Sequence, residues 1–433
     1  MFDPYLVSRI ARCSIAMLIS AATALAAPPT DAQIDQAIKL YKSVFSGGAA
    51  THDAVAAAAK SAMAGLDMNQ LSCLQIARLA DHGSLLSESG QLDAAWARLR
   101  SCLPDRGPDG AAAAVRLLGT RLREAADEPA KLAILRETIS HPGLESAVKQ
   151  GGASRVLGIV SMEAGPLAPR LADDLAQLDK LITPDFAPML APDYTSYYEL
   201  LQRAGAGSTE SGLEPTRLKL VKLARGAAAA ETDEPSRESL ANTADYLDGR
   251  YIKGTLLNHP APELTVLWCS DPAIRALADL KGRVVVLDFW ATWCGPCVES
   301  LPAVKELQER YEDYPVSVVG VSSPQGSVVG LKGGITKADS EQHEFELMRG
   351  YMQLHSITWP LLFSRESVTN PDYGVRGIPH VVIIDPAGIV RHRALHPAQS
   401  LAKKAEKIDA ILREFKLAAP EPLPVAPAQP SGG

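Results

Sequence analysis

The first half of the chain shows the apolar periodicity of helices. Between residues 31 and 250, apolar side chains recur three and four positions apart, as in Leu92, Trp96 and Leu99. Clusters of Gly, Pro, Ser and Asp interrupt this pattern at residues 104–110, 141–143, 151–152, 184–192 and 205–211. The pattern predicts a domain of several short helices over residues 31–250.

Beyond residue 254, short apolar runs alternate with helical stretches. The runs predict strands at residues 263–268, 283–290, 316–321, 360–363, 381–385 and 389–394. Amphipathic stretches predict helices at residues 295–311, 340–354 and 399–415. This alternation predicts an α/β layer fold over residues 254–416. The Pro- and Ala-rich stretch that follows, residues 417–433, is expected to be disordered.

One stretch of the helical half has a more specific spacing. Its small and apolar residues resemble a single tetratricopeptide-type helical hairpin, at Gly83, Leu86, Gly90, Leu92, Ala95, Leu99, Cys102 and Leu103. An ordinary antiparallel helix pair explains the pattern equally well. In both cases Cys73 starts the first helix and Cys102 ends the second, so the two cysteines lie at helix ends that meet. We expect a structural disulfide between them, and two buried free thiols are the alternative.

The N-terminus has the features of a signal peptide over residues 1–26. Arg9 and Arg12 precede an apolar stretch at residues 13–26, which ends in the small residues Ala24 and Ala26. This stretch falls short of the ~20 apolar residues that a spanning helix needs. We therefore expect cleavage and export, for example to a periplasm. An uncleaved membrane anchor is the alternative.

Charge and cysteine content narrow the function further. The net charge of −7 and the absence of a Lys/Arg run argue against a nucleic-acid partner. An oxidising compartment permits disulfides. Cleavage would leave an odd number of cysteines, at Cys73, Cys102, Cys269, Cys294 and Cys297.

The Cys294-Gly295-Pro296-Cys297 motif lies between a predicted buried strand and a predicted helix. Disulfide exchange needs one thiolate that attacks and a second thiol that resolves the mixed disulfide. A helix N-terminus favours the thiolate of Cys294, which is therefore the expected nucleophile. Cys297 lies one turn further on and is the expected resolving thiol.

Two other interpretations of this cysteine pair are weaker. A zinc site needs four ligands, and Cys269, His259 and His380 show no metal-binding spacing relative to the motif. We therefore expect no metal. A purely structural disulfide fits poorly with an ordered strand-to-helix junction, because reactive groups usually lie at such sheet ends.

Two further positions belong with the cysteines. Asp288 interrupts an apolar strand, and a buried carboxyl has a raised pKa, which suits a proton acceptor for the resolving thiol. A carboxylate paired with an unlocated Lys or Arg is the alternative. Pro379 opens another buried strand, where a cis bond after Ile378 would expose the Ile378 backbone to an incoming peptide, and a trans proline is the alternative.

Three segments together resemble the thioredoxin superfamily: VVVLDFWATWCGPC, GIPHVVIID and APELTVL. More narrowly, they resemble exported thiol–disulfide oxidoreductases of the TlpA/ResA type. The resemblance covers residues 254–416 and implies a central sheet flanked by helices. It also implies catalytic roles for Cys294, Cys297, Asp288 and a cis Pro379, with Ile378 touching substrate.

Some positions depart from the family pattern. Many members carry a glutamate two residues before the helix proline, where Ser300 stands here, and Glu299 lies one residue earlier. His380 replaces a frequent threonine, and we expect it to modulate the site or take no part. A peroxiredoxin resemblance is weaker, because Leu287 and Ala291 stand where that motif has Pro and Thr.

The sequence therefore predicts an exported oxidoreductase that reduces disulfides in partner proteins. Trp293, Gly295, Pro296 and Ile378 are expected to contact the substrate. The redox-active cysteines replace any organic cofactor, and the resemblance implies a membrane electron donor of the DsbD type. The helical domain is expected to dock partners or to pair two copies into a homo-oligomer. The alternative is a redox-inert helical scaffold with a thioredoxin-like cap.

Overall fold

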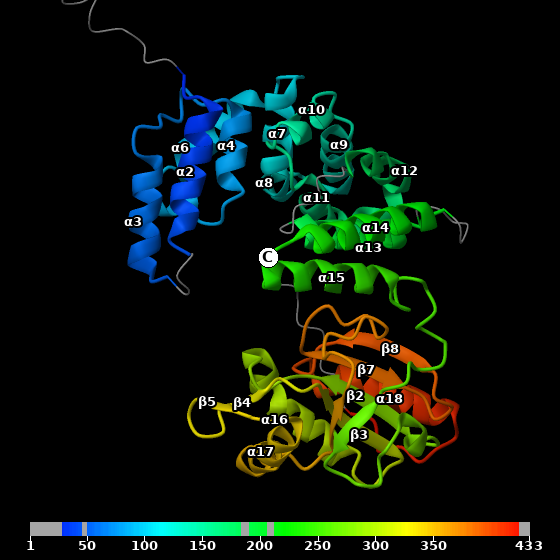
Figure 1. Cartoon of the computed structure of the whole chain (residues 1–433). Helices are drawn as coiled ribbons and strands as arrows, with labels where there is room; N and C mark the ends of the chain where they lie inside the picture. Colours follow the sequence, from blue (N-terminus) through cyan, green and yellow to red (C-terminus); the bar gives the residue numbers. More distant parts are fainter. Residues whose placement is uncertain (1–27, 46–49, 183–189, 206–211, 424–433) are drawn as a thin grey trace, which may run out of the picture. The chain divides into compact units, whose positions relative to one another are not determined.

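The computed structural model describes residues 28–45, 50–182, 190–205 and 212–423. The chain divides into two compact units. The first unit comprises Met1–Thr183 and Pro192–Leu213, and the second comprises Pro184–Ala191 and Glu214–Gly433 (Figure 1). The predicted signal peptide, residues 1–26, lies outside the described residues. Within the described ranges, no helix combines the length and apolar character needed to cross a membrane.

The first unit is built from helices, as its periodicity predicts. They are α2 (Asp31–Ser43), α3 (His52–Met63), α4 (Cys73–Ala80), α5 (Leu85–Glu88), α6 (Leu92–Cys102), α7 (Pro108–Arg116), α8 (Leu118–Glu124), α9 (Glu128–Ile139), α10 (Leu144–Lys149), α11 (Val156–Ala164), α12 (Ala172–Ala176) and α13 (Ala191–Ala204). Side-chain oxygens of Thr30, Thr51 and Ser72 cap the first turns of α2, α3 and α4, so the local sequence defines where these helices begin.

A disulfide joins the first turn of α4 to the last turn of α6. The Cα atoms of Cys73 and Cys102 are 6.6 Å apart, and both cysteines are buried in the core of this unit. The hairpin of α4, α5 and α6 thus brings together the two helix ends that the sequence analysis expected to meet. The disulfide closes a loop between residues 29 positions apart and ties the hairpin together.

The second unit contains a six-stranded mixed sheet in the order β1-β6-β3-β2-β7-β8. The strands are β1 (Val266–Cys269), β2 (Val284–Phe289), β3 (Val316–Ser322), β6 (Leu361–Ser364), β7 (His380–Ile384) and β8 (Val390–Leu395). In the centre, β2 pairs in parallel with β3 and antiparallel with β7. Every residue of β2 is buried, which explains its unbroken apolar run.

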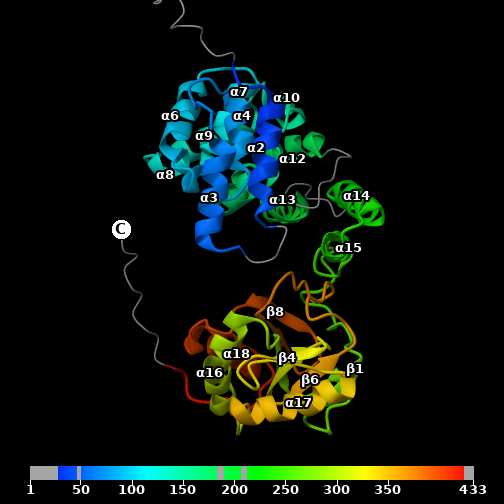
Figure 2. The same cartoon turned by 60° about the vertical axis from the view of Figure 1, so that its left-hand side comes forward.

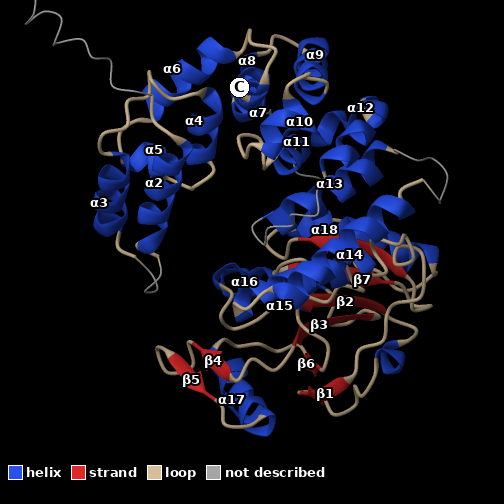
Figure 3. Ribbon diagram, turned by 45° about the horizontal axis from the view of Figure 1, so that its top comes forward, coloured by secondary structure: helices blue, strands red, loops and turns tan. Residues whose placement is uncertain are grey.

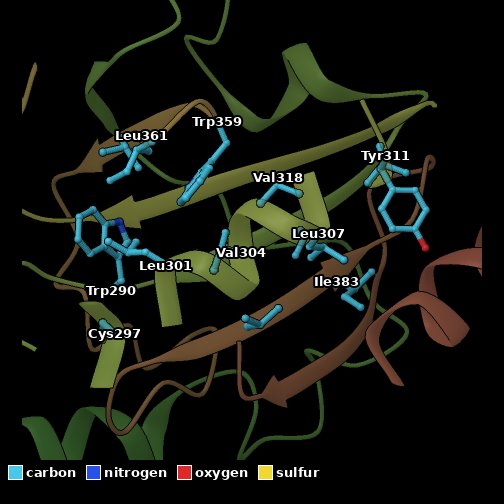
Figure 4. Close-up of a cluster of buried hydrophobic side chains, with 14 of the residues drawn as sticks. Trp290, Cys297, Leu301, Val304, Leu307, Tyr311, Val318, Trp359, Leu361 and Ile383 are labelled. Carbon is cyan, nitrogen blue, oxygen red and sulfur yellow. The ribbon is translucent and has the colours of Figure 1, made fainter. Parts of the chain in front are cut away.

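Three helices pack on one face of this sheet: α16 (Gly295–Arg310), α17 (Glu341–Leu354) and α18 (Leu401–Glu414) (Figure 2). The core on this face joins side chains of the strands to those of the three helices. Figure 4 shows part of it, with Trp290, Val304, Leu307, Val318 and Ile383. A second core, on the opposite face, contains Val285, Leu287 and Phe289 of β2. The sheet is therefore covered on both faces, as the predicted α/β fold requires.

A short hairpin, β4 (Ser327–Val329) and β5 (Ile335–Lys337), precedes α17 (Figure 3). The sequence pattern does not predict these strands, because the segment is rich in glycine and its longest apolar run, Val328–Val329, has only two residues. Gly330 and Gly333 adopt positive φ angles in the turn between them.

The boundary between the units differs from the predicted one. Two helices that the sequence analysis placed in the helical domain, α14 (Glu214–Ala230) and α15 (Glu234–Asp248), belong to the second unit. The physical reason lies in the last turn of α15 and just after it. The Arg393 guanidinium stacks 3.6 Å from the Tyr251 ring centroid, and the Arg376 guanidinium lies 5.5 Å from that of Tyr246.

The C-terminal stretch also differs from expectation over residues 417–423. Leu417 and Leu423 pack against the helix-covered face of the core, and the Arg310 guanidinium donates to the backbone oxygen of Glu421 at 2.8 Å. The predicted disorder is therefore wrong for these residues, because apolar side chains among the prolines find core surface to cover. Residues 424–433 of the predicted tail lie outside the described residues.

Candidate active site

The Cys294–Cys297 pair lies where β2 gives way to α16. The two cysteines form a disulfide with a Cα–Cα distance of 5.2 Å. Cys294 is the N-cap residue of α16, and its Sγ accepts a hydrogen bond from the Cys297 backbone N–H at 3.2 Å. Pro296 lies in the first helical turn, where the missing N–H of proline costs little.

The same geometry gives the two thiols different acidity and different exposure to solvent. When the disulfide is reduced, the helix N-terminus and the Cys297 amide favour negative charge on Cys294 Sγ. Cys294 is 5% exposed and Cys297 is 1% exposed. Gly295 and Pro296, which lie between the two cysteines, are exposed, so the sulfur of Cys294 can be approached past them. These features fit the expected division into a nucleophile and a sheltered resolving thiol.

The loop before β7 lies beside the disulfide. The Ile378–Pro379 peptide bond is cis, and the Ile378 carbonyl oxygen lies 3.7 Å from Cys294 Sγ. Ile378 is half-buried, and its side chain packs against both cores of the unit. His380, the first residue of β7, pairs with Phe289, the last residue of β2. The disulfide, which follows β2, and this loop, which precedes β7, therefore lie at the same end of the two strands.

Asp288 lies in β2 among apolar residues. Alternation along the strand directs its side chain to the same face as Val286 and Trp290, the face on which α16 carries Cys297. The carboxyl is buried, and burial raises its pKa to about 7. Within the described ranges, its Oδ1 atom has no hydrogen-bond partner. A proton acceptor with this pKa can gain or lose its proton near neutral pH.

A buried lysine, Lys404 of α18, acts electrostatically on Asp288. Its side chain is 2% exposed, and its ammonium group donates to the backbone oxygen of Pro397. The positive charge lowers the pKa of Asp288 against the larger effect of burial. Burial in turn lowers the pKa of Lys404 itself. Lys404 is therefore a cation that acts on Asp288 through its charge, a residue that the sequence pattern did not single out.

His380 and the glutamate position are where this chain departs from the family pattern. Burial lowers the pKa of His380 to about 3, so its ring is neutral near pH 7. Its Nε2 accepts a hydrogen bond from the Ala394 backbone N–H at 3.1 Å, which anchors β8. Ser300 is buried and donates to the Cys297 backbone oxygen at 2.8 Å, and Glu299 is exposed. His380 and Ser300 thus make hydrogen bonds to the backbone of the fold, and Glu299 lies at the surface.

Trp293 is the most exposed aromatic group at the site. Its side chain is 51% exposed, and its Nε1–H donates to Gln325 Oε1 at 2.8 Å. Gln325 follows β3, and no sequence pattern connects it with the site. Among the described residues, the cysteine outside a disulfide is Cys269, which is half-buried on the edge strand β1. Within the part of the chain that the structure describes, no three His, Cys, Asp or Glu side chains form a group suited to a metal ion.

Comparison with known proteins finds similarity between this unit and redox proteins. The family model described as Redoxin matches residues 256–412. The thioredoxin-like protein YneN of Bacillus subtilis is 30% identical over 132 residues, which are 30% of this chain and 66% of YneN. The thiol:disulfide interchange protein DsbE of Allochromatium vinosum is 26% identical over 39% of this chain and 83% of its own length. The thiol-disulfide oxidoreductase ResA of Bacillus anthracis is 25% identical over 26% of this chain and 56% of its own length.

Solved structures also resemble part of the chain. The thioredoxin domain of a thiol-disulfide oxidoreductase from Bacteroides vulgatus is 21% identical, with a TM-score of 0.27 over 35% of this chain and 96% of that domain. The curated relatives are matched over between 13% and 83% of their lengths, so the likeness concerns a domain. These relatives support a redox function at the level of the family. Residues 256–412 of this chain are a redoxin domain with a thioredoxin-like fold, similar to proteins named thiol-disulfide oxidoreductase ResA and thiol:disulfide interchange protein DsbE.

Proposed function

We propose that this protein is an exported thiol–disulfide oxidoreductase that reduces disulfides in partner proteins. The observation that carries the proposal is the arrangement around the helix start. Cys294 caps α16, Cys297 is sheltered one turn later, and the buried Asp288 lies on the same face of the sheet. This set provides a nucleophile, a resolving thiol and a proton acceptor, which together suffice for disulfide exchange.

In the first step the Cys294 thiolate attacks one sulfur of the substrate disulfide. A bond forms between Cys294 Sγ and that sulfur, the substrate disulfide breaks, and the other substrate cysteine leaves as a thiolate that takes a proton from water. The exposed surface of Trp293, Gly295 and Pro296 faces the incoming segment. The Ile378 backbone lies beside the attacking sulfur and is suited to pair with an extended segment of the substrate.

In the second step the Asp288 carboxylate accepts the proton of the Cys297 thiol. The Cys297 thiolate then attacks Cys294 Sγ, the mixed disulfide breaks, and the second substrate cysteine leaves as a thiolate that is protonated in turn. Two electrons have passed from the protein dithiol to the substrate disulfide. The protein is left with the Cys294–Cys297 disulfide, the form that the structure describes.

The direction of exchange and the partners are part of the same proposal. The Gly-Pro pair between the cysteines resembles the reducing members of the superfamily. Regeneration of the dithiol needs two electrons from another dithiol, which we assign to a membrane donor of the DsbD type. The cysteines themselves are the redox centre, so the cycle needs no organic cofactor. Export through residues 1–26 would place the reaction in a compartment where substrate disulfides form.

The first test is reduction of insulin by the reduced protein, compared with Cys294→Ser, Cys297→Ser and Cys269→Ser. The first two variants should lose turnover, and Cys269→Ser should keep it, because Cys269 lies on the edge strand β1. Alkylation of the reduced protein at mildly acidic pH should label Cys294 before Cys297. A wild-type protein that leaves insulin disulfides intact would support the redox-inert scaffold instead.

The helical unit is proposed to dock partners or to pair two copies. Docking on one unit raises the effective concentration of a substrate disulfide at the other. The Cys297→Ser variant should trap partners as mixed disulfides. With this substitution, residues 214–423 alone should therefore trap fewer partners, and with less selectivity, than the full chain. Equal trapping by both would remove the helical unit from substrate choice. Sedimentation of the full chain and of the fragment tests pairing.

A further inference from the structure

The indole of Trp293 is exposed and is held by a hydrogen bond. An exposed tryptophan beside a nucleophile is free to adopt several rotamers unless a polar contact fixes it. Here the Nε1–H donates to Gln325 Oε1 at 2.8 Å, across 32 positions of sequence. The contact joins the residue before the nucleophile to the loop that follows β3.

Gln325 is itself oriented by two further bonds. Its Nε2 donates to the Ser323 backbone oxygen at 2.8 Å and to Ser323 Oγ at 3.0 Å. Ser323 Oγ also accepts from the Val368 backbone N–H at 3.1 Å. With its amide nitrogen engaged on Ser323, the Gln325 side chain can only present its oxygen to the indole.

The backbone of this loop is bound by a buried carboxylate. Glu344 of α17 is 1% exposed, and its two oxygens accept the Gln325 N–H at 2.9 and 3.0 Å, while the Gly326 N–H donates to Oε2 at 2.8 Å. A buried carboxylate costs free energy unless several donors satisfy it. The hydrogen bonds to Glu344 therefore fix the backbone position of Gln325 in the folded protein.

A second bond ties the neighbour of Trp293 to the β4–β5 hairpin. Thr292 Oγ1 accepts from the Val329 backbone N–H at 3.1 Å, and Val329 pairs with Ile335 on β5. Both residues that precede Cys294 are therefore attached to the segment between β3 and α17. That segment supports the exposed face of the site.

We propose that Gln325 is a positioning residue that holds the Trp293 indole as the contact for apolar side chains beside the substrate cystine. The proposal rests on the function proposed above and names its substrate class: disulfides flanked by apolar residues. A fixed indole offers a large apolar surface at little further entropic cost on binding. Charged flanking residues gain nothing from this surface and must give up hydration to approach it.

The test uses the full-length protein and two disulfide-bridged peptides that differ in having Leu or Glu beside a cysteine. Gln325→Ala should lower kcat/KM for the Leu peptide by about 2- to 10-fold, the effect of one lost hydrogen bond, mainly through KM. Trp293→Phe removes the donor and keeps a ring. In that background Gln325→Ala should cause no further loss, which is the non-additivity expected of a contacting pair.

Two controls separate positioning from general damage. Gln342→Ala makes the same change at an exposed position of α17 and should leave the rates unchanged. The rate at which iodoacetamide labels Cys294 should be equal in the wild type and in Gln325→Ala, because the proposal does not involve thiolate formation.

The outcomes are distinct. Equal kcat/KM for wild type and Gln325→Ala, additive losses in the double variant, or a wild type that does not prefer the Leu peptide would overturn this inference while leaving the reductase proposal standing. A wild type that reduces neither peptide nor insulin would sink both proposals. Loss on the Leu peptide alone, absent in the Trp293→Phe background, supports the positioning role.

Discussion

The carboxyl of Asp288 and the ammonium of Lys404 are buried on the same face of the central sheet, and each favours the charged form of the other. Lys404 lowers the pKa of Asp288, and Asp288 raises the pKa of Lys404. Burial opposes both effects and is the larger cause for each group. The site therefore contains an acid poised near neutral pH, with a nearby cation that sets how readily it ionises.

Replacing Asp288 with Asn should stabilise the second unit at alkaline pH. Folding raises the pKa of Asp288 from 3.8 to about 7, so its contribution to stability is complete below about pH 4 and is lost as the pH rises through about 7. The unfolding free energy of the variant should therefore exceed that of the wild type by an amount that grows between these two pH values and reaches up to about 4 kcal/mol above pH 7. Urea unfolding of the oxidised proteins, followed by tryptophan fluorescence, measures the difference.

The matched control for this prediction is Asp313→Asn, at an exposed position after α16. This variant should follow the wild type across the pH range. A constant offset between Asp288→Asn and the wild type, independent of pH, would show that Asp288 does not take up a proton on folding.

Replacing Lys404 with Met should move the pH profile of the resolving step upward. Without the ammonium, the pKa of Asp288 rises further, so the carboxylate that accepts the Cys297 proton forms only at higher pH. Stopped-flow measurement of mixed-disulfide resolution across pH tests the shift. Lys403→Met changes an exposed neighbour on α18 and should leave the profile in place. An unchanged profile in Lys404→Met would remove the lysine from the proton transfer.

The strands and helices around the cysteines could be predicted from sequence because their patterns are local. The apolar run at residues 283–290 and the cysteine motif define β2 and the start of α16 within one residue. Lys404 was missed because a lysine on an amphipathic helix usually lies on its solvated face. Its place at helical spacing between Leu401 and Ile408, within the apolar stripe of α18, was the available indication.

The contacts of Gln325 could not be predicted in the same way. Its hydrogen bond to Trp293 spans 32 positions, and the loop that carries it has no periodic pattern. Glu344 gave a signal similar to that of Lys404, since it interrupts the apolar stripe that continues through Met348 and Tyr351. Long-range polar contacts of this kind follow from the tertiary fold, so a single sequence leaves them open.

Removing the Cys73–Cys102 disulfide should destabilise the first unit. The bridge closes a loop between residues 29 positions apart, for which chain entropy predicts about 3–4 kcal/mol of stabilisation. The double variant Cys73→Ala and Cys102→Ala should therefore unfold at a lower temperature in calorimetry of the oxidised protein. Insulin reduction should persist, because neither cysteine belongs to the redoxin domain. An unchanged unfolding temperature would mean that the bridge restrains little in the unfolded chain.

A C-terminal fragment beginning at Glu214 should be more stable than one beginning at residue 254. The shorter fragment loses Tyr251, over whose ring Arg393 stacks, and Tyr246, which Arg376 covers. It also loses the hydrogen bond from the Arg250 N–H to Asp372 Oδ1 at 3.3 Å. Each cation–π contact contributes about 0.5–2 kcal/mol, so a deficit of about 1–4 kcal/mol is expected.

Urea unfolding of fragments 214–423 and 254–423 measures this difference directly. In the full chain, Tyr251→Leu removes the ring and keeps an apolar side chain, so it should reproduce part of the stability deficit. Tyr314→Leu, which removes a tyrosine from a different aromatic contact, is the control for the general effect of losing a tyrosine. Equal stability of the two fragments would return α14 and α15 to the helical domain and restore the boundary near residue 254. A less stable shorter fragment would show that the redoxin domain extends its folding unit to the α14–α15 hairpin. The reason is that Tyr246 at the end of α15 and Tyr251 after it contact the loop before the cis proline and β8, respectively.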